Sequence, residues 1–98
     1  DRNIKTNIEP IRDALSKVSR IGGYTFNRTD GGSERRTGVI AQEVLDVLPE
    51  AVYTTDNGTL TVAYGNMVGL LIQAIKELQE SLDKSQQRIT ELENKFQS

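Results

Sequence analysis

The residue types of this 98-residue sequence allow few kinds of catalysis, because it contains no cysteine and no histidine. Without cysteine there is no disulfide framework, no thiolate nucleophile and no cysteine-ligated zinc or iron–sulfur site. Without histidine, a Ser-His-Asp triad, a histidine-ligated metal and a histidine pH switch are excluded as well. Any catalysis must therefore use hydroxyls, carboxylates, lysine amines or backbone groups, and we expect neither a metal nor a cofactor.

Charge is unevenly distributed along the chain, although the net charge is only −2. Residues 1–36 carry eight basic and five acidic side chains, whereas residues 37–64 carry four acidic and no basic ones. The two segments could attract each other within one chain or between chains. The weak net charge and the lack of interleaved basic and aromatic residues argue against nucleic acid as a partner. No apolar run is long enough to span a membrane, so we expect no membrane contact either.

The length fits a single domain, residues 1–98, which we expect to be small and of mixed α+β class. Apolar residues at helical spacing after Pro10, and two glycines at 22 and 23, predict a helix over about 10–20. Asn57-Gly58 between two short β-type runs predicts a hairpin with a tight turn. The expected elements are an extended lead-in at 1–9, the helix at 10–20, strands at 24–28 and 38–40, a helix at 41–48, and strands at 51–55 and 59–63.

The segment from 29 to 36 is polar and contains Asp30-Gly31-Gly32-Ser33, residue types that favour turns. It is either a hairpin loop or a mobile projection, and we expect residues 24–40 to form an arm. Arg35 and Arg36 could bind a phosphate, but a solvated charge pair is the more ordinary interpretation of two adjacent arginines. These residues alone therefore define no site.

From Gly65 onward, the spacing of apolar residues changes to alternate steps of three and four, which predicts one long helix over 65–98 with a heptad seam. Residues 1–64 form the globular α+β part. A helix folded against its own domain is an equally good interpretation for residues 65–78, where Met67, Leu70, Ile72 and Ala74 widen the apolar stripe. Residues 79–98 have a narrow seam with polar flanks, which favours self-association. Ser85 alone interrupts the seam, which otherwise consists of Val68, Leu71, Ile75, Leu78, Leu82, Ile89, Leu92 and Phe96. The periodicity does not separate a dimer from a trimer.

Several segments together resemble the self-cleaving intramolecular chaperone domain at the C-terminal end of phage endosialidases, tailspikes and tail fibres. Related domains occur in the eukaryotic myelin regulatory factor. The similarity is carried by segments in the family's order that cover almost the whole chain: Asp1 to Lys5, Asn7 to Ile11, Gly38 to Val44, Leu48 to Val52, and Leu70 to Leu78.

The resemblance implies a homotrimer that helps the upstream fibrous domain of the same polypeptide to fold and then cuts itself off through a serine–lysine dyad. The scissile bond would join a serine to Asp1, and Lys5 would be the general base. A lysine can take the proton of a serine hydroxyl when burial lowers its pKa. Asp1 at the start of the chain is what such a cut would leave. Gln42 and Glu43 match a family signature at the start of a short helix. They either orient the cleavage site or have only a structural role at the end of that helix.

The expected function is therefore a single-turnover serine endopeptidase and trimerisation chaperone that acts in the host cell cytoplasm during phage assembly and is released from the mature fibre. The alternative is a permanent oligomerisation module of a fibrous protein that shares the fold but never cuts. A serine before Asp1 would favour cleavage, and any other residue would favour the permanent module. A regulatory-factor relative is disfavoured, because such a chain should continue into a transmembrane segment and this one ends in a polar coil.

Overall fold

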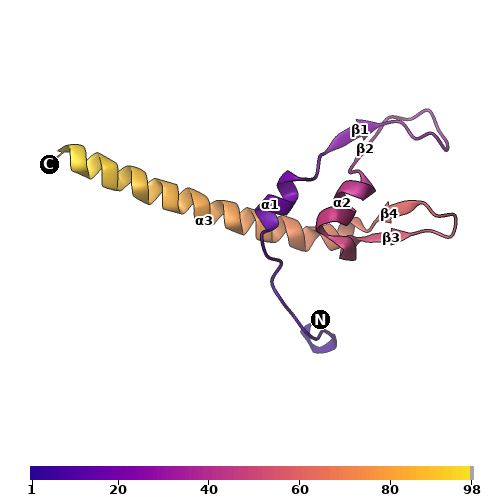
Figure 1. Ribbon diagram of the computed structural model, residues 1–98, viewed down its shortest axis with the longest axis horizontal. Coiled ribbons are helices and arrows are strands. Elements are labelled where there is room, and N and C mark those ends of the chain that lie inside the picture. Colours follow the sequence, from indigo (N-terminus) through magenta and orange to yellow (C-terminus); the bar gives the residue numbers. More distant parts are fainter. Residues whose placement is uncertain (98) are drawn as a thin grey trace.

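The computed structural model describes residues 1–97, which form a small body at one end of a long helix (Figure 1). The molecule is elongated, with principal extents of 68 × 40 × 21 Å. Helices and short strands both contribute, so the α+β class is confirmed. The helical elements are η1 (Arg2–Ile4), α1 (Ala14–Ser19), α2 (Ala41–Val47), η2 (Pro49–Ala51) and α3 (Tyr64–Gln97), and the strands are β1 (Tyr24–Phe26), β2 (Arg36–Gly38), β3 (Val52–Thr54) and β4 (Leu60–Val62).

The strands form two separate antiparallel hairpins, β1 with β2 and β3 with β4. In the second hairpin the Thr55 N–H donates to the Thr59 carbonyl at 2.9 Å, which closes the turn at Asn57-Gly58. Gly58 has a φ of 85°, a left-handed backbone that glycine adopts without steric cost. The predicted tight hairpin is therefore confirmed. Residues 29–35 lie in the loop of the first hairpin, which projects from the body, and Arg36 already belongs to β2 (Figure 1).

The core is thin and lies where α1 and α2 meet the first three turns of α3. Val44 and Leu70 are its largest fully buried side chains. The remaining buried residues are Ala14, Val47, Leu48, Ala51, Val62, Met67 and Ala74. Met67, Leu70 and Ala74 pack against the body as expected, but Ile72 is 51% exposed and does not extend that packed face. A core of this size gives a marginally stable single chain, which favours association.

The first helix is shorter than the sequence predicts, beginning at Ala14 rather than at Pro10. Asp13 has φ 52° and ψ 40°, a left-handed conformation that stops the helix from extending further toward the N-terminus, and its side chain makes no capping hydrogen bond. The Glu77 carboxylate on α3 caps the helix instead, accepting from the N–H groups of Ala14 at 2.7 Å and Leu15 at 3.1 Å. A contact over more than sixty residues of sequence therefore fixes where α1 starts.

Two further expectations differ in detail. The lead-in is not extended throughout, because residues 2–4 form a 3-10 turn capped by the Asp1 carboxylate, which accepts from the Asn3 N–H at 2.8 Å. The expected strand at 38–40 lies at Arg36–Gly38, since the antiparallel register pairs Gly38 with Tyr24 and Arg36 with Phe26. Helix α3 runs without interruption over the predicted range up to Gln97, and residue 98 of that prediction lies outside the described residues.

Candidate functional site

Asp1 and Lys5 lie at the two ends of the 3-10 turn in the lead-in. The Ile4 N–H donates to the Asp1 carbonyl at 3.3 Å, and the Lys5 N–H donates to the Arg2 carbonyl at 3.2 Å. Beyond the turn, Lys5 has an extended backbone with φ −116° and ψ 140°. Local hydrogen bonds thus hold the lysine about one turn of chain from the peptide bond that would precede Asp1.

This lead-in is exposed along its whole length. Residues 1–10 are all exposed, and Figure 1 shows the segment running away from the body. Two large aliphatic side chains on it face water, Ile4 at 81% and Ile8 at 66% exposure. The lead-in therefore presents two apolar side chains and Lys5 to solvent.

The predicted seam residues on α3 are also exposed, although the helix buries a neighbouring face against the body. Those expected to line the seam are each at least 45% exposed, namely Leu71, Ile75, Leu78, Leu82, Ile89, Leu92 and Phe96. The C-terminal part of the helix leaves the body and extends alone (Figure 1). An apolar stripe in this position has no partner within the described chain, so it is available to other copies of the helix.

Gln42 and Glu43 stand in the first turn of α2. The Glu43 carboxylate accepts from the Gly22 N–H at 2.9 Å through Oε1 and from the Tyr24 hydroxyl at 2.8 Å through Oε2. The hydrogen bond from Tyr24 to this carboxylate, with some burial and the nearby negative charge, raises the pKa of the Tyr24 hydroxyl above its usual value. Glu43 therefore contacts the base of the arm, and its support of the cleavage site stays a prediction.

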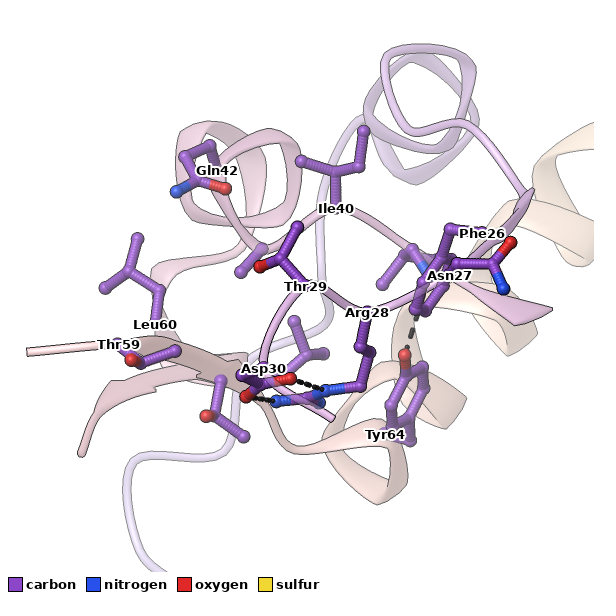
Figure 2. Close-up of a pocket in the computed structure, with 14 residues that line it drawn as sticks. Phe26, Asn27, Arg28, Thr29, Asp30, Ile40, Gln42, Thr59, Leu60 and Tyr64 are labelled. Atoms are coloured by element: carbon purple, nitrogen blue, oxygen red, sulfur yellow. Dashed lines mark hydrogen bonds and ion pairs between the residues drawn. The ribbon is translucent and has the colours of Figure 1, made fainter. Parts of the chain in front are cut away.

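Gln42 faces a cleft of about 590 Å³ between the arm and the β3–β4 hairpin (Figure 2). Arg28 and Asp30 form an ion pair at the edge of this cleft, with Arg28 Nε 2.7 Å from Asp30 Oδ1. The hydrogen bond from Arg28, opposed by a little burial, lowers the pKa of Asp30 to about 2. The Arg28 charge is thus partly neutralised within the loop. Arg35 donates to Asn27 Oδ1 at 2.7 Å and to Thr25 Oγ1 at 3.0 Å, and the phosphate interpretation of Arg35 and Arg36 stays untested.

No group of three or more metal-ligating side chains lies together in residues 1–97. Within the same range no helix is both long and apolar enough to cross a membrane. Sequence reasoning missed the roles of Glu77, Tyr24 and Tyr64, whose contacts lie far away in sequence. Tyr64 at the start of α3 accepts from the Val39 N–H at 3.5 Å, and no local pattern indicates that contact.

The sequence model that describes the chaperone of endosialidase, a peptidase family by name, matches residues 1–53. The chain belongs to the chaperone of endosialidase family. The matched range contains Asp1 and Lys5, the arm and all of α2. Family membership confirms the resemblance found in the sequence motifs, and it makes the domain one of a peptidase-like class.

Long tail fiber proteins called Gp37 are similar to this chaperone of endosialidase domain over nearly all of its length. Those of Enterobacteria phages K3 and T2 are each 37% identical over 104 residues, covering 98% of this chain. That of Salmonella phage S16 is 33% identical over 105 residues, covering 96% of this chain. The chain spans only 8%, 7% and 14% of these three proteins, respectively.

Proposed function

We propose that this chain is the C-terminal chaperone domain of a phage tail fibre. Three copies associate along α3, assist the folding of the upstream fibrous part of the same polypeptide in the host cell cytoplasm, and are then released by cleavage before Asp1. The observation that carries the proposal is the solvent-exposed apolar stripe on a helix that extends alone beyond a family-matched body. The similarity to long tail fiber proteins supports a fibre as the client.

Association through α3 follows from the energetics of the stripe. Each leucine or isoleucine removed from water contributes about 1.5–3 kcal/mol. The seven seam residues named above recur at heptad spacing, so a neighbouring helix can cover all of them at once. Parallel association places the three bodies at the same end of the bundle, where their lead-ins and arms surround a common axis.

Cleavage uses a serine that precedes Asp1, with Lys5 as the general base. The neutral amine of Lys5 takes the proton of the serine hydroxyl, and the serine oxygen attacks its own scissile carbonyl to form a lactone ester. The C–N bond breaks as the Lys5 ammonium gives that proton to the departing nitrogen of Asp1, which leaves as a new amine. Water then hydrolyses the ester, which restores the serine hydroxyl and leaves a free carboxylate. Because nucleophile and peptide bond belong to one chain, the reaction proceeds at a high effective concentration of the two groups. This mechanism needs neither histidine nor cysteine, in agreement with the composition.

Burial of Lys5 by neighbouring copies couples cleavage to assembly. Lys5 is exposed in the single chain. Burial disfavours the charged form of a lysine and so produces the amine that a base requires. The exposed Ile4 and Ile8 on either side supply the apolar surface through which a neighbouring copy covers this segment.

The experiment expresses the chain joined to its natural upstream sequence and follows its products on a denaturing gel. Lys5→Ala abolishes release of the C-terminal fragment, whereas Lys84→Ala, an exposed lysine on α3, leaves release intact. Leu78→Asp, which places a charge in the seam, prevents both association and release. Cleavage that persists in Lys5→Ala contradicts the dyad, and cleavage that persists in a monomeric Leu78→Asp variant contradicts the coupling.

The permanent oligomerisation module remains the second candidate, because the exposed Lys5 has no contact in the single chain that commits it to catalysis. Both functions use the same seam and predict the same association. A full-length product that stays uncut while its fibre folds assigns the chain to the permanent module.

A further inference from the structure

The base of the arm is fixed to the body by two tyrosine contacts, one on each strand. On the strand that leads into the arm, Glu43 binds the Gly22 N–H at 2.9 Å and the Tyr24 hydroxyl at 2.8 Å. We call these two hydrogen bonds the Glu43 clamp. Glu43 lies on α2, one residue from the fully buried Val44, so the clamp joins the arm to the rigid core.

On the returning strand, the hydroxyl of Tyr64 accepts from the Val39 N–H at 3.5 Å (Figure 2). Glycines beside both tyrosines leave room for these contacts. A Cβ added at Gly38 would lie 2.6 Å from the Tyr64 hydroxyl, and one added at Gly22 would overlap the Tyr24 hydroxyl. Each strand of the arm is therefore held by a tyrosine hydroxyl packed over a residue with no side chain.

The arm adds little to the buried core. Val39 at its base packs against the core, but no residue from 24 to 40 is fully buried, and the strands are exposed apart from Phe26 and Gly38, which are half-buried. Both side-chain oxygens of Glu43 are bound at the base of this element, so they fix its direction relative to α2. The arm also forms one wall of the cleft in Figure 2, so its angle sets the width of that cleft.

We propose that Glu43 is a positioning residue for the arm in the folding of the client polypeptide, and that it acts separately from self-cleavage. This inference rests on the proposed chaperone function. Both Glu43 oxygens are bound at the base of the arm, and residues 1–10 are exposed. Releasing the clamp therefore leaves the seam and Lys5 in place while the arm loses its fixed angle.

The clamp has its own spectroscopic signature. The chain has three tyrosines and no tryptophan, so phenolate absorbance reports tyrosine ionisation directly. The hydrogen bond to Glu43 raises the pKa of Tyr24 above 10, so the bond is complete below pH 10 and is lost as the pH rises through the raised value. Glu43→Gln returns the pKa of Tyr24 toward its usual value. This titration shows that the clamp has opened, whatever happens to the client.

The functional test uses the full polypeptide and compares Glu43→Gln, Tyr24→Phe and the double variant. Protease-resistant fibre on a gel measures client folding, and the released C-terminal fragment measures cleavage. The bond from Tyr24 is exposed to solvent, and an ordinary hydrogen bond shifts an equilibrium by about two- to tenfold, so we expect a yield of folded fibre lower by about that factor. Because both variants break the same bond, the double variant should fold the client no worse than either one.

Glu50→Gln, an exposed glutamate outside the clamp, serves as the matched control and keeps the wild-type yield. Unchanged client folding in Glu43→Gln and Tyr24→Phe overturns the inference. Loss of cleavage in step with loss of folding also overturns it, because Glu43 would then act on the cleavage site. If the unmodified polypeptide neither cleaves itself nor needs this domain for its fibre to fold, the proposed function itself fails. That outcome is seen without any substitution, so it is distinct from the two results that overturn the role of Glu43.

Discussion

Removing the Glu77 carboxylate tests how the N-terminal segment is fastened to the long helix. Glu77 on α3 accepts two hydrogen bonds from the first turn of α1, at 2.7 Å from the Ala14 nitrogen and 3.1 Å from the Leu15 nitrogen. Asp13 precedes this turn in a left-handed conformation and contributes no side-chain cap. Glu77 is therefore the cap of α1, and Glu77→Ala leaves both N–H groups without it.

The magnitude follows from the two bonds and their partial burial. Loss of an N-cap costs about 1 kcal/mol, and hydrogen bonds to charged groups contribute about 1.5–3 kcal/mol each, so we expect Glu77→Ala to lose about 2 kcal/mol. For a chain of this size that lowers Tm by about 8–16 °C at a fixed protomer concentration. Glu77→Gln keeps one acceptor oxygen and should lose about half as much.

Thermal melting and amide hydrogen exchange measure the effect globally and locally. A loss of 2 kcal/mol raises the opening of the Ala14 and Leu15 amides about 30-fold. Glu80→Ala, an exposed glutamate one turn further along the helix, is the control and should melt like the wild type. If Glu77→Ala has the same Tm as Glu80→Ala, and the Ala14 and Leu15 amides keep their protection from exchange, Glu77 is not the cap of α1.

Three further predictions concern other parts of the chain. Arg28→Ala should raise the pKa of Asp30 from about 2 toward 3.8, and NMR titration of the Asp30 carboxyl carbon measures this value. An unchanged pKa contradicts the ion pair. In the wild type the ion pair is complete above pH 3.8 and is lost as the pH falls through about 2. Gly38→Ala places a Cβ 2.6 Å from the hydroxyl of the half-exposed Tyr64 and should displace it from the Val39 N–H, with a loss of about 1 kcal/mol or less in urea unfolding. Tyr64→Phe removes that oxygen, so Gly38→Ala should cost less stability in the Tyr64→Phe protein than in the wild type. An equal cost of Gly38→Ala in the two proteins refutes the steric argument. Leu82→Asp shifts the chain to monomer in sedimentation equilibrium, while an unchanged mass shows that the seam does not hold the copies together.

Local patterns predicted most of the elements correctly. The Asn57-Gly58 hairpin, the short helix before Pro49 and the long C-terminal helix all follow from nearest neighbours and periodicity, and all are present. The exposed stripe on α3 was also evident in the sequence, since heptad spacing places its members on one side of any helix.

The remaining features depend on contacts between distant residues. The start of α1 is set by Glu77, and nothing near Pro10 in the sequence indicates that the helix begins four residues later. The place of Glu43 at the base of the arm depends on Tyr24, nineteen residues away. The motif around Gln42 and Glu43 is one of the segments that together indicated the family, but the side-chain contacts of Glu43 appear only in the folded chain.

The most direct test of self-release determines the mass of the C-terminal fragment produced by the polypeptide with its upstream sequence. The account predicts one fragment that starts at Asp1, with an unmodified amine, in the wild type and none in Lys5→Ala. A fragment that starts at another residue, or the same fragment in both proteins, contradicts it.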